Sequence, residues 1–238
     1  MTSLQQKSDI VKLAHSLLDR MRDSIDPHYG LGTMTCSVYD TAWVSMIPKT
    51  DGHNTIWLFP QAFNYVLEKQ QQHGGWQSSD NLVCSPADGI LNTAAALLSL
   101  CRHRATPYQL DVGPAGLEER ISRGLLSLNR MLDEWKIEDT WNVGFEILVP
   151  AMLDYLGEHD MKFDFPCCSA LYRIRDAKLS MLNLRGLEED GAAPHSILHS
   201  LEALRRHLDF NRVAQHKVCG SIMASPSATA AYLIFATE

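Results

Sequence analysis

Residues 72–97, QHGGWQSSDNLVCSPADGILNTAAAL, decide the fold of this 238-residue chain. They read in order as the end of a helix, a glycine turn, a Ser-Pro helix start and a helix of small residues. The same order returns in residues 215–233, QHKVCGSIMASPSATAAYL. Repeated helical units of this kind bury their apolar faces by stacking on one another. Because strand-like alternation is absent, the repeat predicts an all-α fold of helix hairpins stacked into a larger helical barrel.

The segments around the two copies also follow helical periods. Residues 4–25 predict one amphipathic helix, whose apolar stripe must dock on something else in the protein. In the next segment, Ser37 is typical of an N-cap and Trp43 of a buried core residue. Further helices are predicted over residues 37–47, 60–72, 90–100, 117–135, 144–156, 170–184 and 197–208.

Composition excludes several classes of protein. The formal net charge is −7 and no basic run occurs, which argues against nucleic acid as a partner. No apolar run reaches the length of a transmembrane segment. The N-terminus lacks the features of a secretory signal or a transit peptide, and the six cysteines are scattered without a CxxC pair. A cytoplasmic, reducing location is therefore expected.

The segment Ser196-Ile197-Leu198-His199-Ser200-Leu201-Glu202 holds the first candidate site residue, His199. Its neighbours Ile197, Leu201 and Leu204 recur at helical spacing, so His199 is expected to point away from their apolar face. In a cavity shared with another domain, such an imidazole can transfer a proton. The alternative interpretation is an ordinary surface or rim histidine.

Two charged segments supply the other candidates. Lys178 lies in the basic helix 173–179 (RIRDAKL), whose cations could bind a diphosphate or could instead form a solvated face paired with nearby acids. The acidic turn 133–139 (DEWKIED) contains Glu134 and Glu138. Carboxylates at this spacing can hold a magnesium ion, or they can simply form an exposed helix end.

Six stretches in a fixed order carry a resemblance to a known family. They are residues 37–43 (SVYDTAW), 71–76 (QQHGGW), 90–94 (ILNTA), 143–147 (VGFEI) followed by Pro150, 198–202 (LHSLE) and 220–230 (GSIMASPSATA). Together they resemble the N-terminal part of class II diterpene cyclases of the copalyl diphosphate synthase type. The resemblance is strongest to the fungal bifunctional copalyl diphosphate/ent-kaurene synthases.

The resemblance implies two α-helical barrel domains, named γ and β. Residues 1–28 would be the first helix of the β domain, residues 29–214 the γ domain, and residues 215–238 the truncated start of the remaining β domain. It also implies an isomerase that protonates geranylgeranyl diphosphate and cyclises it to copalyl diphosphate, in the ent series that leads towards ent-kaurene and gibberellin-type diterpenoids. Whether a kaurene-forming class I domain, a lyase, accompanies it is left open.

The same resemblance assigns roles to the candidate residues. His199 matches the histidine that acts, through water, as the final base. Lys178 falls at the lysine assigned to the diphosphate, with a gap of about three residues in the match. Glu134 to Glu138 aligns with an EDxxD-like motif that implies Mg²⁺ as cofactor. This motif is degraded, because Trp135 replaces an acid and the last position is a glutamate.

The largest departure from the family is the absence of a DxDD motif, whose middle aspartate is the catalytic acid, and of a class I DDxxD motif. Both are expected beyond Glu238, so the sequence is interpreted as part of a longer protein. Protonating an alkene requires a strong acid in a dry cavity, so the isolated chain is not expected to cyclise geranylgeranyl diphosphate. The alternative is a non-catalytic helical module that retains the cyclase architecture. A squalene-hopene type of cyclase is disfavoured by the stretches 39–43 and 198–200.

Overall fold

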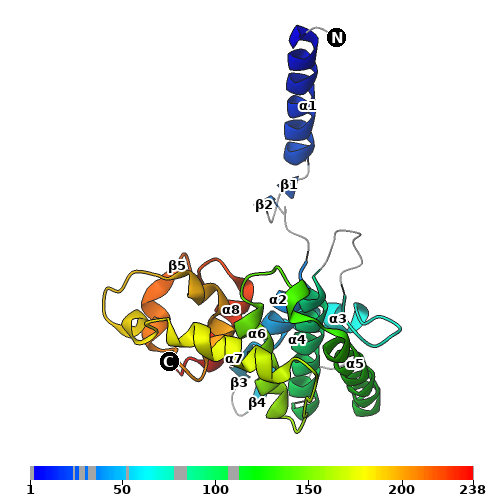
Figure 1. Ribbon diagram of the computed structural model, residues 1–238, viewed down its shortest axis with the longest axis vertical. Coiled ribbons are helices and arrows are strands. Elements are labelled where there is room, and N and C mark those ends of the chain that lie inside the picture. The colour runs from blue at the N-terminus through cyan, green and yellow to red at the C-terminus, as the bar shows by residue number, and fades with distance from the viewer. Residues whose placement is uncertain are drawn as a thin grey trace. The chain divides into compact units, whose positions relative to one another are not determined.

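A computed structural model describes residues 3–23, 25–26, 30–31, 36–51, 54–77, 85–106 and 113–237. The chain divides into two compact units, Met1–Cys36 (unit 1) and Ser37–Glu238 (unit 2). Helices dominate the described residues (Figure 1), so the all-α prediction is confirmed. The predicted assignment of residues 1–28, 29–214 and 215–238 to two domains stays a prediction.

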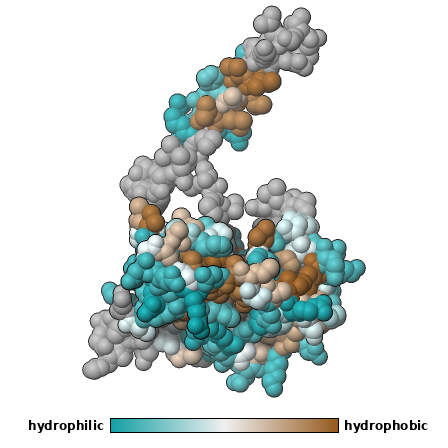
Figure 2. Space-filling view, turned by 60° about the vertical axis from the view of Figure 1, so that its left-hand side comes forward, coloured by the Kyte–Doolittle hydropathy of each residue, from teal (hydrophilic) through white to brown (hydrophobic). Residues whose placement is uncertain are grey.

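Unit 1 contains the amphipathic helix predicted over residues 4–25. The helix α1 (Ser3–Asp23) is followed by the two-residue strands β1 (Ile25–Asp26) and β2 (Gly30–Leu31). Apolar and polar residues lie side by side along its described part (Figure 2), and the apolar Ile10 and Leu13 are 66% and 61% exposed. The stripe is therefore present as predicted, whereas its docking partner stays a prediction.

The core of unit 2 is built around α4 (Pro86–Ala105), which packs against α2 (Val38–Ser45), α5 (Pro114–Glu134) and α6 (Phe145–Gly157). The run of alanines at residues 94–96 is buried, and small residues there allow α2 to come close. The hydroxyls of Ser45 and Ser99, one from each helix, lie 2.7 Å apart. Trp43 is fully buried, as predicted.

The repeat read from the sequence also appears as a structural repeat. Ser85 begins α4 and Ser225 begins α8 (Pro226–Phe235), and each serine hydroxyl accepts a backbone N–H of the following turn. In both copies a threonine inside the helix, Thr93 or Thr229, accepts a hydrogen bond of 3.0 Å from the backbone of the preceding turn. The α8 helix packs against α2 and the segment that carries His199.

Two features differ from the sequence expectation. Short antiparallel hairpins interrupt the helices. The sequence does not predict them, because strands of two to four residues are too short for their alternation to show. The segment predicted as a helix over 197–208 is instead η3, a 3₁₀ helix with a kink. The remaining elements are β3 (Pro48–Asp51), β4 (Asn54–Trp57), α3 (Pro60–Glu68), η1 (Ile137–Asp139), α7 (Cys168–Ser180), η2 (Arg185–Glu188), η3 (Ser196–Leu204), η4 (Arg212–His216), β5 (Lys217–Val218) and β6 (Ser221–Ile222).

Candidate functional site

His199 is exposed on η3, between residues that are buried. Leu198 and Leu201 are fully buried, and Glu202 is only 2% exposed. In a regular 3₁₀ helix, residues three apart lie on the same face, so His199 and Glu202 would point the same way. Ser200, with φ −113° and ψ 36°, is not helical and breaks this arrangement. The kink therefore separates the exposed imidazole from the buried carboxyl group.

Hydroxyl groups from distant parts of the chain hold both sides of this kink. Ser225 Oγ, at the start of α8, donates to the carbonyl of His199 at 3.3 Å. The Tyr155 hydroxyl, from α6, donates to the carbonyl of Glu202 at 2.8 Å. The Tyr39 hydroxyl, from α2, donates to Oε1 of the same glutamate at 3.0 Å. Three elements thus fix the backbone on which His199 is mounted.

Burial dominates the electrostatics of Glu202. Loss of solvent raises the pKa of its carboxyl group to about 7, although the hydrogen bond from Tyr39 acts in the opposite direction and Asp40 adds to the rise. The same burial raises the pKa of the Tyr39 phenol well above its ordinary value. The pKa of the Tyr155 phenol is also raised, chiefly by burial. Both tyrosines therefore stay neutral donors, while Glu202 is close to the midpoint of its titration at neutral pH.

Lys178 lies on α7 and pairs with Glu146 of α6. Glu146 also accepts a hydrogen bond of 3.0 Å from the backbone N–H of Gly144 through its other carboxylate oxygen. A Cβ placed on Gly144 would lie 3.9 Å from Oγ of Ser200, the residue after His199. Glu146 thus binds Lys178 with one carboxylate oxygen and, with the other, the backbone of Gly144, a residue that lies near Ser200.

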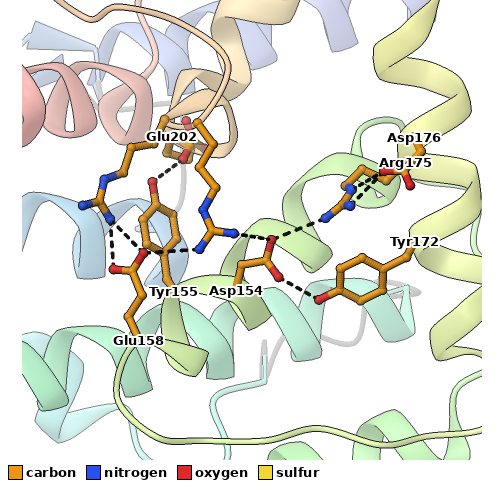
Figure 3. A network of polar contacts seen from close by, with 9 residues as sticks. Asp154, Tyr155, Glu158, Tyr172, Arg175, Asp176 and Glu202 are labelled. Carbon is orange, nitrogen blue, oxygen red and sulfur yellow. Dashed lines mark hydrogen bonds and ion pairs between the residues drawn. The ribbon is translucent and has the colours of Figure 1, made fainter.

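A second polar network ties η3 to α6 and α7 (Figure 3). Asp154 accepts from the Tyr172 hydroxyl at 2.9 Å and pairs with Arg175 and, less closely, with Arg206. Glu158 receives two hydrogen bonds, of 3.1 and 2.9 Å, from one guanidinium nitrogen of the arginine at position 205. The guanidinium groups in this network therefore already face carboxylates, and Arg175 is the member that belongs to the basic helix 173–179.

The predicted magnesium ligands, Glu134 and Glu138, are both exposed, at the end of α5 and in η1 respectively. Within the described ranges, no three His, Cys, Asp or Glu side chains gather as a metal site. The described residues by themselves therefore do not form a cage for the ion. Magnesium binding by this turn stays a prediction, and no chemical step is derived from it.

Sequence reasoning did not select Tyr39, Glu146 or Glu202 as site residues, although each lies in a stretch that carries the resemblance. A usable signal was present around Glu202. The leucines at 198, 201 and 204 repeat every three residues, which is the period of a 3₁₀ helix and not of an α-helix. A glutamate directly beside this apolar series is a candidate for a buried carboxyl group.

Comparison with known proteins shows relatives that match almost the whole chain. No family model matches the chain. The chain is 46% identical, over 99% of its length, to the ent-kaur-16-ene synthase of Fusarium fujikuroi, and 41% identical, over 97%, to the copalyl diphosphate synthase of Talaromyces verruculosus. It spans 24% and 23% of those enzymes, about a quarter of their length.

Solved structures agree with this assignment. Abietadiene synthase from Abies grandis matches 96% of the chain with a TM-score of 0.74 and 27% identity, the match covering 28% of that protein. An ent-copalyl diphosphate synthase from Arabidopsis thaliana matches 84% of the chain with a TM-score of 0.67 and 24% identity, covering 27% of that protein, which supports the fold. The chain is thus homologous to part of the class II diterpene cyclases, and the resemblance inferred from its motifs is confirmed. Within that class, the relatives that share 40–46% identity include ent-kaurene and copalyl diphosphate synthases.

Among the described residues, no helix combines the length and the apolar character needed to cross a membrane.

Proposed function

We propose that this chain is part of a class II diterpene cyclase that converts geranylgeranyl diphosphate to copalyl diphosphate. The observation that carries the proposal is the 46% identity to ent-kaur-16-ene synthase over 99% of the chain. Within that frame, His199 supplies the base that removes the last proton. A neutral imidazole accepts a proton near neutral pH, and one ring nitrogen can do so through an intervening water.

The position of His199 supports this role. A general base must be mounted firmly and still reach its proton. His199 is exposed, while Leu198 and Leu201 near it are anchored in the core of unit 2. The acid that starts the reaction is not among these 238 residues, because they contain no DxDD motif. We therefore propose that this part of the enzyme contributes the base and not the proton donor.

Lys178 is proposed to bind the diphosphate. Its ammonium group pairs with Glu146, and an incoming diphosphate, with more negative charge, would compete with that carboxylate. The Mg²⁺ implied by the resemblance would act together with the diphosphate. Glu134 and Glu138 would need further ligands from outside the described residues.

A graft tests the proposal. Residues 1–238 would replace the corresponding quarter of the Fusarium fujikuroi ent-kaur-16-ene synthase, and the purified hybrid would be supplied with geranylgeranyl diphosphate. After phosphatase treatment, gas chromatography with mass spectrometry should detect diterpene products from the hybrid. His199→Ala should lower the yield of deprotonated product by about 100-fold and increase hydroxylated bicyclic products, because water then quenches the cation.

His207→Ala is the matched control, since His207 is also exposed and lies just beyond the end of η3. It should leave the product profile unchanged. Identical profiles from the two alanine variants would contradict the role of His199. A hybrid that folds and forms no diterpene at all would contradict the proposed function and favour the alternative, a non-catalytic helical module.

A further inference from the structure

Glu202 has no role in the function proposed so far, yet it is the most thoroughly buried acid near His199. A charged or neutral carboxyl group in a core costs free energy that an apolar side chain of similar size would avoid. Here the cost is not fully offset. Oε1 accepts one hydrogen bond, from Tyr39, and Oε2 receives no well-formed hydrogen bond from the described residues, although Ser227 lies near enough to act on the pKa.

We propose that Glu202, held by Tyr39, is a positioning residue that sets the direction of the His199 imidazole through the kink at Ser200. The proposal rests on the proposed function, in which His199 is the base. It assigns no direct contact between Glu202 and substrate. Its content is geometric: the buried carboxyl group prevents η3 from winding as one regular 3₁₀ helix, and so keeps His199 on the outside.

Regular winding of η3 is incompatible with an exposed His199 and a buried Glu202. Regular winding would bring residues 199 and 202 onto one face. Either the imidazole would enter the core or the carboxyl group would leave it. Since the Tyr39 hydroxyl binds the carboxyl group inside, the backbone must turn between the two residues. The non-helical torsion angles of Ser200 are that turn.

Tyr39, which anchors Glu202, is itself held by other elements. Tyr39 is fixed at its own backbone, whose N–H donates to Oδ1 of Asn92 in α4 at 3.1 Å. The neighbouring Asp40 accepts a hydrogen bond of 3.2 Å from the backbone N–H of Ser227 in α8. The phenol that holds Glu202 is therefore part of a junction of α2, α4 and α8. A change at Tyr39 should be transmitted to the kink and to His199.

Side-chain hydroxyls bind the carbonyl groups on both sides of the kink. Those of His199 and Glu202 accept from the hydroxyls of Ser225 and Tyr155. Backbone carbonyls in a continuous helix are occupied by amides further along the chain, so side-chain hydroxyls in that place replace helical bonds. They stabilise the bent arrangement that Glu202 imposes.

The test observes the histidine ring directly and needs no substrate. The 238-residue chain, labelled with ¹³C at Cε1 of its ten histidines, would be examined by NMR across a pH titration. The signal of His199 is identified as the one that disappears in His199→Gln. Tyr39→Phe removes one hydroxyl, and Ser225→Ala removes another on the opposite side of the kink. Each should displace the His199 signal by more than its line width and move the midpoint of its titration.

Tyr172→Phe is a control of matching chemistry. Its hydroxyl also donates to a carboxylate, Asp154, at 2.9 Å, and burial likewise raises the pKa of its phenol, but the bond lies outside the kink. Tyr172→Phe should lower the melting temperature by an amount similar to Tyr39→Phe and leave the His199 signal in place. A fourth variant, Glu202→Gln, keeps the shape of the side chain and should leave the His199 signal close to its original position, because Tyr39 can donate to the amide oxygen.

The proposal is overturned if Tyr39→Phe and Ser225→Ala lower the melting temperature while the His199 signal and titration stay those of the unmutated chain. It is also overturned if Tyr172→Phe displaces that signal equally. Two separate hydroxyl variants keep the test decisive if one of them does not fold. Because the measurement involves no turnover, its outcome is independent of the graft, and a failed graft would refute the base without refuting the geometry.

Discussion

The two copies of the helical repeat, residues 72–105 and 215–235, begin alike and are stabilised in different ways. In the first copy, the carboxylate at the helix start belongs to the same turn: Asp88 accepts from the backbone N–H of Ser85 at 3.1 Å and completes a capping box. In the second, the carboxylate comes from α2, where Asp40 accepts from Ser227, 187 residues further along. The backbone at the helix start of the first copy is thus capped from within its own turn, whereas that of the second receives its carboxylate from a distant part of the chain.

The buried titratable groups of the two regions differ in the same sense. On α4, His103 is stacked between Trp57 and Phe63 at ring distances of 4.2 and 3.6 Å, and burial lowers the pKa of its imidazole to about 4. Next to α8, burial raises the pKa of Glu202 to about 7. In both cases burial favours the neutral form of the side chain. At physiological pH the histidine is neutral throughout, whereas the charge of the glutamate changes within that range. The second copy, which takes its capping carboxylate from a distant residue, therefore also lies next to Glu202, the group whose charge changes near neutral pH.

The largest effect should come from the turn of the first copy. Gly74 has φ +94°, and a Cβ there would lie 2.2 Å from the backbone oxygen of Arg123 in α5. Gln70 fastens this turn to α5 by hydrogen bonds of 2.9 Å to Gly74 and to residue 120. Gly74→Ala should cost more than about 4 kcal/mol or prevent folding of unit 2. The measurement is urea unfolding followed by tryptophan fluorescence, since all five tryptophans lie in unit 2.

The corresponding control is Gly220→Ala in the second copy. Gly220 has φ +79°, but nothing lies within 4 Å of the place a Cβ would take. The cost should be confined to the left-handed backbone, about 1–2 kcal/mol. Equal losses from the two substitutions would show that the close approach to α5 does not distinguish the copies.

The second prediction concerns stability as a function of pH. His103 has a folded pKa below the unfolded value of 6.5, so the stability it contributes is complete above pH 6.5 and is lost as pH falls towards 4. Glu202 has a folded pKa above the unfolded value of 4.5, so its contribution is complete below pH 4.5 and is lost as pH rises through 7. Loss of either contribution lowers the free energy of unfolding by about 3 kcal/mol, because one unit of pKa corresponds to about 1.4 kcal/mol. Between pH 4.5 and 6.5 the two effects oppose each other and should nearly cancel.

Single substitutions should separate the contributions of the two groups to the pH dependence of stability. In Glu202→Gln, the free energy of unfolding should rise from pH 4 to 6.5. In His103→Phe, which keeps a ring in the aromatic stack, it should fall from pH 4.5 to 7. Urea denaturation at half-unit pH intervals measures both. If both variants keep the flat profile of the unmutated chain, the titration of these two groups does not govern its stability.

The same contrast between local and distant contacts explains which parts of the structure the sequence predicts. The first copy was predictable because its signals are local: Ser85-Pro86 begins α4, and the alanines at 94–96 mark its close packing. The all-α fold and the diterpene-cyclase resemblance depend on such local signals. The kink in η3 could not be predicted, because the residues that hold it, Tyr39, Tyr155 and Ser225, are distant in sequence.

The candidate site divides in the same way. The exposure of His199 followed from its neighbours, because the apolar series around it is local. The pairing of Lys178 with Glu146 joins α7 to α6 across 32 positions, and no pattern in either helix names the partner. The buried state of Glu202 depends on three elements at once. Patterns of one element therefore predict which residues face outwards, but not which partners they meet.

The smallest effect tests whether the second helix start is coupled to the buried carboxyl group. Asp40→Ala and Asp88→Ala each remove a carboxylate from a helix start and should each cost about 1 kcal/mol. At pH 8, however, the charge of Asp40 also repels ionised Glu202, since it contributes to the raised pKa of that group. Removing Asp40 relieves this repulsion and recovers part of the loss.

In a Glu202→Gln background there is no charge to relieve, so Asp40→Ala should cost more there than in the unmutated chain. Asp88→Ala should cost the same in both backgrounds, because Asp88 serves a separate turn and distant sites add. A double-mutant cycle by urea denaturation measures the difference, and additivity for both aspartates would mean that the second copy is as self-contained as the first.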